Sequence, residues 1–150
     1  MLAALFLGFL QAAAGTLMPP GWKIVKDAKG ICQVAVPPEW VPWTDSAGAA
    51  VFHDATTAIA VVTYQAGQNF QPLTAGMLKT LDIRKEKLFE NTAKRIFYQE
   101  KTSSNAELPN AYSSSVPVKG ATCSCRVVAL PSIPDEVVKK IALTLGPVAE

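Results

Sequence analysis

Hydrophobic and polar residues alternate in several stretches of the chain, which is the pattern of half-buried β-strands. The segment 22–25 alternates, and β-type residues resume at 31–36 after the turn-forming residues 27–30, so we expect a hairpin. Pro37 and Pro38 end its second strand because proline has no amide donor. Further strands are expected at 49–53, 57–64, 95–100, 111–118 and 121–130, the last two joined across Lys119-Gly120.

The segment 57–64 has apolar residues on both faces, which is typical of a central strand that is covered on each side. After it the periodicity becomes helical. Pro72 suits a first helical turn, and the spacing then predicts a surface helix from about 73 to 89 packed on the sheet. Its apolar stripe holds Leu73, Met77, Leu81 and Leu88, with Met77 and Phe89 interpreted as core residues. The charged run 84–87 is interpreted as its solvated face.

A second helix is predicted from about Pro134 to Leu145. Ser132 is its expected N-cap, with the acidic Asp135 three residues later, and Gly146-Pro147 ends it. Strands in consecutive runs, with helices to cover the sheet, indicate an α+β fold.

The first ten residues form an apolar run without a charged side chain. Gln11 and the small residues 12–15 follow, and small side chains fit the cleavage pocket of a signal peptidase. We therefore predict a signal peptide at 1–14, cleaved after Ala14, and one exported domain at 15–150 in the periplasm or outside the cell. The run is shorter than the roughly 20 apolar residues of a membrane span.

Two alternatives to cleavage stay open for this N-terminal segment. No basic residue precedes the apolar run, and the first charged side chain is Lys23, so the usual basic start of a cleaved signal peptide is missing. If the segment is not cleaved, it acts as an N-terminal membrane anchor. A buried N-terminal helix is the second alternative, although no polar residues mark an outer face.

Three cysteines lie at 32, 123 and 125. In an oxidising compartment two of them should pair. If 121–130 is a strand, Cys123 and Cys125 point to the same face, so either can reach Cys32, whereas a bridge within Cys-Ser-Cys would be strained. Three reduced, buried thiols are the competing interpretation.

The three cysteines and His53 also have the ligand types of a closed zinc site. Their spacing matches no known zinc finger, so we expect no metal and no cofactor. A thiol-dependent redox or metal-binding protein using these four residues is kept as the second functional hypothesis.

Few residues could support catalysis. His53 is the only histidine, with Asp54 beside it, and no Gly-x-Ser-x-Gly, phosphate-binding glycine loop or paired-histidine motif is present. The acidic pair Asp135-Glu136 is explained by helix capping. The net charge of +2 is too small to indicate nucleic-acid binding. We therefore expect a protein that is not an enzyme and does not bind nucleic acid.

The stretch Ile31-Cys-Gln-Val-Ala-Val-Pro37-Pro-Glu-Trp40, a β-type segment followed by Pro-x-x-Trp, resembles the opening of proteins of the PsbP/Mog-like fold. The order of strands, long helix, antiparallel strands and C-terminal helix is similar over almost the whole exported domain. The resemblance implies a central antiparallel sheet between helices, an α/β/α sandwich. It implies little about activity, because members include a photosystem extrinsic subunit, a Ran-binding nuclear factor and exported bacterial proteins of unknown role.

Trp40 and Trp43 lie in an aromatic-rich connection after the first hairpin. They are expected to plug one end of the core, and the alternative is an aromatic platform for a ligand. The resulting hypothesis is an exported, non-enzymatic binding or assembly module. It would dock a protein or another envelope component through a sheet edge or through this tryptophan corner.

Overall fold

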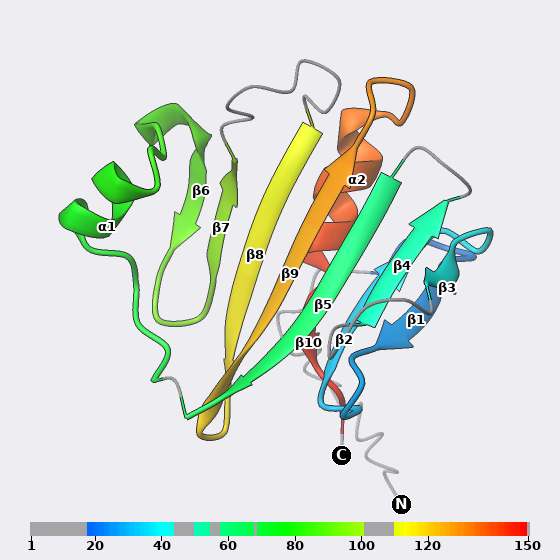
Figure 1. Cartoon of the computed structure of the whole chain (residues 1–150), viewed down its shortest axis with the longest axis horizontal. Helices are drawn as coiled ribbons and strands as arrows, with labels where there is room; N and C mark the ends of the chain where they lie inside the picture. Colours follow the sequence, from blue (N-terminus) through cyan, green and yellow to red (C-terminus); the bar gives the residue numbers. More distant parts are fainter. Residues whose placement is uncertain (1–17, 44–49, 55–57, 68, 101–109, 150) are drawn as a thin grey trace, which may run out of the picture.

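The computed structural model describes residues 18–43, 50–54, 58–67, 69–100 and 110–149, and only the backbone of 43, 50–54, 58, 59 and 110 (Figure 1). The predicted signal peptide at 1–14 therefore lies outside the described residues. The elements, in chain order, are β1 (Lys23–Lys26), β2 (Cys32–Val36), β3 (Val41–Trp43), β4 (Ala50–Asp54), β5 (Ala58–Ala66), α1 (Ala75–Thr80), the 3-10 helix η1 (Lys85–Lys87), β6 (Leu88–Asn91), β7 (Ile96–Gln99), β8 (Asn110–Val118), β9 (Ala121–Ala129), α2 (Asp135–Leu143) and β10 (Gly146–Pro147).

The strands form two antiparallel sheets. The large sheet has the order β3-β4-β5-β9-β8-β7-β6, and the small sheet has the order β1-β2-β10. The hairpins predicted at 22–36 and 111–130 are confirmed, and β5 is a central strand as expected. The small sheet joins the two ends of the domain, because β10 near the C-terminus pairs with β2.

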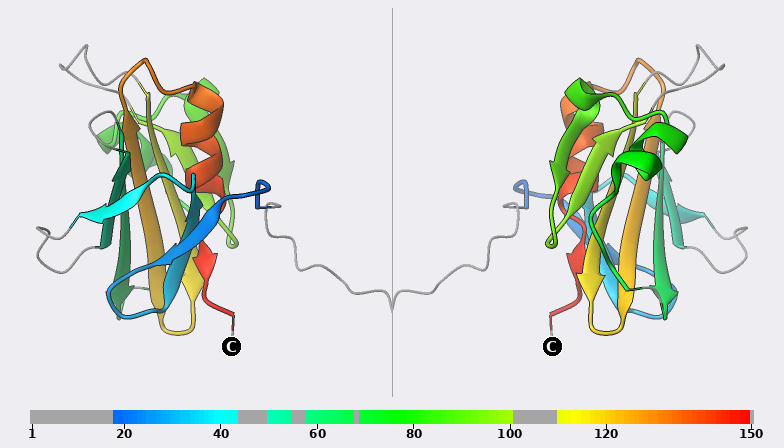
Figure 2. Two further views of the ribbon diagram at one scale, coloured as in Figure 1. Left: turned by 90° about the vertical axis from the view of Figure 1, so that its right-hand side faces the viewer. Right: turned by 90° about the vertical axis from the view of Figure 1, so that its left-hand side faces the viewer.

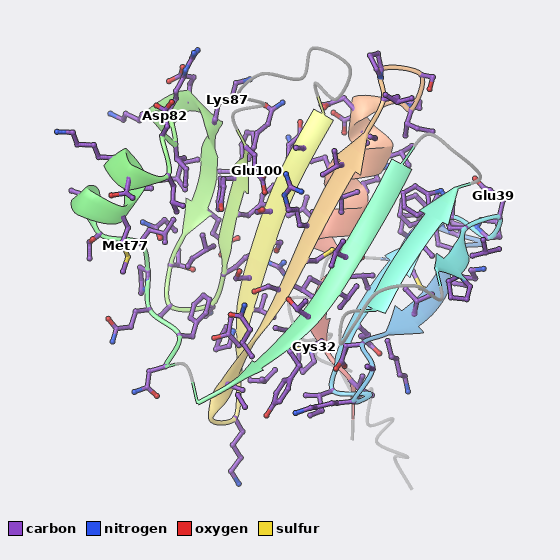
Figure 3. All side chains as sticks on the ribbon, in the orientation of Figure 1. Cys32, Glu39, Met77, Asp82, Lys87 and Glu100 are labelled. Carbon is purple, nitrogen blue, oxygen red and sulfur yellow. A yellow bond between two sulfur atoms is a disulfide. The ribbon has the colours of Figure 1, made fainter. Side chains whose placement is uncertain are left out.

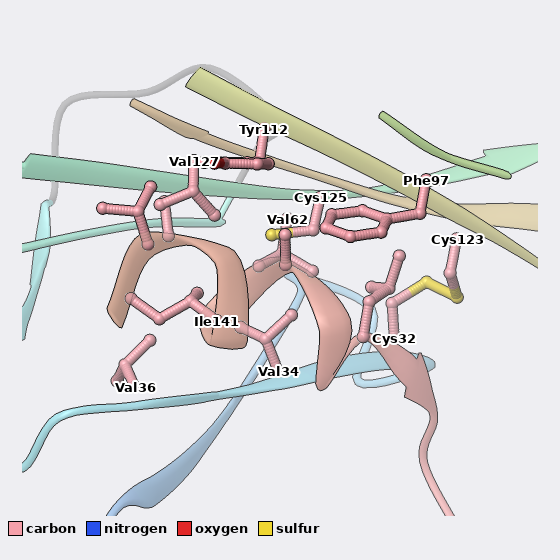
Figure 4. Close-up of a cluster of buried hydrophobic side chains, with 14 of the residues drawn as sticks. Cys32, Val34, Val36, Val62, Phe97, Tyr112, Cys123, Cys125, Val127 and Ile141 are labelled. Atoms are coloured by element: carbon pink, nitrogen blue, oxygen red, sulfur yellow. A yellow bond between two sulfur atoms is a disulfide. The ribbon is translucent and has the colours of Figure 1, made fainter. Parts of the chain in front are cut away.

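The core lies between the large sheet and a second layer that consists of α2 and the small sheet. Figure 2 shows both of these on the same side of the large sheet. Alternate residues of β9 point into this core, and Val34 of β2 and Ile141 of α2 meet them from the other layer (Figure 4). Burial of these side chains holds the two layers together. The fully buried residues of β9 are Cys123, Cys125, Val127 and Ala129.

The prediction of one long helix at 73–89 is wrong. Helix α1 has only six residues, and its backbone reverses at Asp82, whose φ of 52° is left-handed. The amide of Ile83 then donates to the carbonyl of Leu78, 2.9 Å away, which closes the helix end.

The rest of the predicted helix forms η1 and the edge strand β6, which pairs with β7. The side chain of Asn91 in β6 both accepts from and donates to the backbone of Leu73, so β6 and the segment before α1 are tied together. Phe89 is 5.1 Å from Phe97, measured between ring centroids, and these non-local contacts override the helical periodicity.

The prediction of an α/β/α sandwich is met only in part, because the protein is mostly β. Helix α2 covers one face of the large sheet, whereas α1 lies beside the β6 edge rather than over the other face (Figure 1). Within the described ranges, helix and small-sheet elements cover only one face of the central strand β5, and Val61 on its other face is half-buried.

Helix α2 lies where the sequence predicted it, although Ser132 is not its cap. The N-cap position is occupied by Pro134, which makes no side-chain capping bond. Tyr112 of β8 instead donates to the Asp135 carboxylate at 2.7 Å and so attaches the first turn to the sheet. Within the described part of the chain, no helix has the length and hydrophobicity needed to span a membrane.

Candidate functional site

The face of the large sheet opposite α2 carries mainly hydroxyl side chains. In Figure 1 this face is toward the viewer, because α2 lies behind the strands. We call it the hydroxyl face, and it comprises Thr63 of β5, Tyr98 of β7, Ser113 and Ser115 of β8, and Ser124 of β9. Together with Val61 and Arg126, these residues line a shallow hollow of about 460 Å³.

Strand register places these residues in two neighbouring rows across four strands. One row contains Val61, Arg126, Ser113 and Tyr98, and the next contains Thr63, Ser124, Ser115 and Ile96. Successive side chains of a strand point to opposite faces, so the residues between these positions enter the core instead. The alternation therefore gives one strand, β9, an apolar core face and a polar outer face.

Arg126 of the first row forms an ion pair with Glu100, which directly follows β7. The Nε and Nη2 atoms of Arg126 lie 2.8 Å from Oε1 and 2.8 Å from Oε2 of Glu100, so the contact is bidentate. The hydroxyl of Ser113 donates to the same carboxylate. Figure 3 shows Glu100 beside β7 and β8 on the side that faces the viewer.

These contacts, together with burial, shift the pKa values of Glu100, Arg126 and Tyr98. Partial burial acts to raise the pKa of Glu100, but the hydrogen bonds from Arg126 and Ser113 outweigh it and leave that pKa below its ordinary value. The same hydrogen bond to Glu100 raises the pKa of Arg126. Burial raises the pKa of Tyr98, so its phenol is neutral at neutral pH. The face therefore offers one fixed ion pair among uncharged hydroxyls.

The arrangement suits hydrogen bonding better than catalysis. The hydroxyls of Ser115 and Ser124 lie 3.0 Å apart and bond to each other. Ser113 is bonded to Glu100, but a carboxylate with a lowered pKa is a weak base and activates a hydroxyl poorly. Among the residues that the structure describes, no group of His, Cys, Asp or Glu side chains is placed to hold a metal ion.

The two tryptophans predicted as a binding corner are placed differently. The side chain of Trp40 is 1% exposed and belongs to the core, which agrees with the packing interpretation. A ligand would reach it only if that part of the core opened. The side chain of Trp43 lies outside the described residues, although its backbone belongs to the edge strand β3. A binding role for Trp43 stays a prediction.

Of the two disulfides that the sequence allowed, the structure contains Cys32–Cys123, with the two Cα atoms 5.6 Å apart. The carboxylate of Asp27 accepts hydrogen bonds from the amides of Ile31 and Cys32, both at 2.7 Å, and so fixes the backbone beside the bridge. Cys125 is buried and free. Burial raises the pKa of its thiol to about 12.

The alternative zinc site would need ligands that this arrangement does not offer together. Cys32 and Cys123 are bonded to each other, so their sulfurs are not thiolates. The backbone of His53 pairs with Ile59 of β5, whereas Cys125 pairs with Val62, and the side chain of His53 lies outside the described residues. A metal-binding role stays a hypothesis that requires the disulfide to be reduced first.

The residues of the hydroxyl face were not singled out from the sequence. Ser124 alternates with Cys123 and Cys125, as is typical of a strand with one solvated face, but Ser113, Ser114 and Ser115 are consecutive, so no alternation marks Ser113 and Ser115 in the sequence. What brings Glu100 to Arg126, however, is the pairing of β7 with β8 and of β8 with β9. Strand register depends on contacts between segments that are distant in the sequence, so local sequence patterns do not predict it.

No protein-family model and no curated protein matches the chain. Among solved structures, it is similar to the solution structure of cyanobacterial PsbP (CyanoP) from Synechocystis sp. PCC 6803. The TM-score is 0.56 and the sequence identity 14%, and the match covers 92% of this chain and 99% of that one. At this identity the likeness concerns the fold and carries no functional residue across. The chain therefore has the PsbP-like fold that its sequence predicted.

Proposed function

We propose that the protein is an exported, non-enzymatic binding or assembly module, which docks an envelope or extracellular partner through the hydroxyl face. The observation that carries the proposal is the pair of hydrogen-bonding rows around Arg126 and Glu100, on a sheet face that α2 and the small sheet leave uncovered. The likeness to a PsbP structure supports the fold from which this surface is built.

Any polar side chains can solvate a sheet face, but short hydroxyl side chains without lysine make this face better suited to docking. Among the described side chains of β5, β7, β8 and β9 that point to this face, none is lysine, and Arg126 is the only basic one. Short hydroxyl side chains lose little conformational entropy when a partner covers them. The carboxylate of Glu100 already holds Arg126 in one orientation, so the remaining N–H groups of the guanidinium are pre-organised for an acceptor on the partner.

Export is supported by the disulfide. Bridges such as Cys32–Cys123 form and persist in oxidising compartments and are rare in reducing ones. This agrees with the signal peptide predicted at 1–14 and with a periplasmic or extracellular location. If that segment is not cleaved, it would hold the same domain at a membrane.

The proposal is tested by co-sedimentation of the full chain with the envelope fraction of its source cells. Ser124→Lys places a long charged side chain in the middle of the hydroxyl face, and we expect it to weaken binding at least tenfold. Ser132→Lys makes the same chemical change in the exposed loop before α2 and should leave binding unchanged. Thermal unfolding of both variants shows that they fold.

Equal binding by Ser124→Lys and the unmodified chain would contradict the proposal, as would equal loss in both variants. Treatment of the envelope fraction with protease, before the protein is added, then separates a protein partner from the other envelope components.

A further inference from the structure

Helix α1 presents apolar side chains to solvent instead of packing them in the core. None of its residues is buried, and Met77 and Leu81 are 50% and 49% exposed. Together with Leu73, Thr74, Gly76 and Thr80 they line a shallow, mainly apolar hollow. Figure 3 shows Met77 at the far edge of the molecule, away from the strands. Single exposed apolar side chains are common, but a cluster of them on one surface marks an interaction site.

Exposed basic side chains follow Met77 along the chain. The segment 79–87 contains Lys79, Arg84, Lys85 and Lys87 against only Asp82 and Glu86, and all six residues are exposed. We call Leu73, Met77 and Leu81, together with these four basic residues, the α1 patch.

We propose that the α1 patch docks the protein on a lipid surface with anionic headgroups. Apolar side chains that enter the headgroup boundary, next to lysine and arginine side chains that meet lipid phosphates, are the two contributions that hold proteins at such interfaces. The excess of exposed basic residues in the segment 79–87 supplies the charge complementarity.

The fold holds this patch in place without covering it. Thr74 caps the helix by accepting from the amide of Met77 at 3.3 Å, and the turn at Asp82 directs the chain from α1 into η1. Asn91 binds the backbone of Leu73 on both its amide and its carbonyl. The patch is thus attached to β6 at one end and exposed along the rest, so docking would require little reorganisation.

The α1 patch is separate from the hydroxyl face. It lies beyond the β6 edge, whereas the hydroxyl face occupies the strands β5, β9, β8 and β7 (Figure 1). A protein that rests on a lipid surface through α1 therefore keeps the hydroxyl face free for a second partner.

The test uses the full chain with vesicles of phosphatidylcholine alone and with vesicles that also contain phosphatidylglycerol. Amide hydrogen exchange of residues 73–87 is the readout, because it is local and is not affected by adsorption of the N-terminal segment. We expect exchange there to slow severalfold on the anionic vesicles only. Leu81→Asp should abolish this protection, and Lys85→Ser should weaken vesicle affinity about fivefold.

Ile24→Asp is the matched control, because Ile24 of β1 is also 50% exposed and lies outside the patch. It should leave the protection of 73–87 intact, and thermal unfolding shows that the variants fold. The proposal is overturned if vesicles do not slow exchange at 73–87, if Leu81→Asp retains the protection, or if phosphatidylcholine protects as well as the anionic mixture. Protection by a protein fraction but not by vesicles would overturn it too and make the patch a protein-binding site.

Discussion

The guanidinium of Arg95 donates a hydrogen bond to the main-chain carbonyl of Leu145, 2.9 Å away. Through its other terminal nitrogen it donates to the hydroxyl of Ser114 at 2.6 Å. Arg95 precedes β7, Ser114 belongs to β8, and Leu145 follows α2, so one side chain joins the large sheet to the end of the helix that covers it. The carbonyls of a helix C-terminus are a favourable place for a cation.

Arg95→Met should therefore destabilise the protein, although methionine keeps much of the apolar stem. It removes two charge-assisted hydrogen bonds and leaves the Ser114 hydroxyl without that donor, at a cost of about 2–3 kcal/mol. Urea unfolding measures the effect. Lys94→Met is the matched control, because Lys94 is exposed, and it should change stability by less than about 0.5 kcal/mol. Equal destabilisation by both variants would show that the Arg95 contacts contribute nothing specific.

Reduction of Cys32–Cys123 should lower stability strongly. The bridge closes a loop with a sequence separation of 91 residues, and a loop of that length corresponds to about 4.6 kcal/mol of lost denatured-state entropy. We expect the urea midpoint to fall sharply when a reductant is added. The variant Cys32→Ala should show the low midpoint with or without reductant. A midpoint that does not respond to reductant in the unmodified protein would rule out this bridge.

The free thiol of Cys125 should be nearly inert in the folded protein. Its pKa is raised from 9.0 to about 12, so the reactive thiolate at pH 8 is on the order of a thousandfold scarcer than in an exposed cysteine. Alkylation without reductant should be very slow in buffer and rapid in denaturant, where one thiol per chain reacts. Rapid alkylation under native conditions would instead favour the thiol-dependent function.

The ion pair on the hydroxyl face should make stability depend on pH in the acidic range. The pKa of Glu100 is lowered from its ordinary value of 4.5, so the carboxylate stabilises the fold above that value, and the contribution is lost as pH falls through the folded pKa. Because Arg126 is 57% exposed, solvent screening limits the contribution to about 1 kcal/mol.

Glu100→Gln should therefore reduce stability at pH 7 by about that amount, and the deficit should be smaller at pH 2, because the carboxylate charge is lost as pH falls through the folded pKa of Glu100. Unfolding curves at the two pH values measure the difference. Glu39→Gln, at an exposed position of the Pro37–Trp40 turn, should be neutral at both. A deficit for Glu100→Gln that persists unchanged at pH 2 would show that packing, not the charge, is responsible.

The sequence predicted elements well where local periodicity and packing agree. Helix α2 and the two hairpins combine both, and the shared strand face of Cys123 and Cys125 followed from their spacing. That same spacing left the partner of Cys32 undecided. The choice depends on where β2 lies over β9, and strand placement across layers is not encoded locally. Leu73 to Leu88 shows the opposite case, because a helical stripe exists there while Asn91 and Phe97 make the non-local contacts that produce β6.

The pairing of β10 with β2 also determines when the small sheet can finish folding. If the protein is exported with its N-terminus first, as proposed, β1 and β2 cross the membrane early, but Cys123 and then Gly146-Pro147 emerge only near the end. Until then Cys32 has no native partner, and the second layer has no α2 to pack against. Strands β1 and β2 of the small sheet are thus the first to cross, but the sheet forms completely only after β10 has followed. This long-range pairing favours slow folding after translocation.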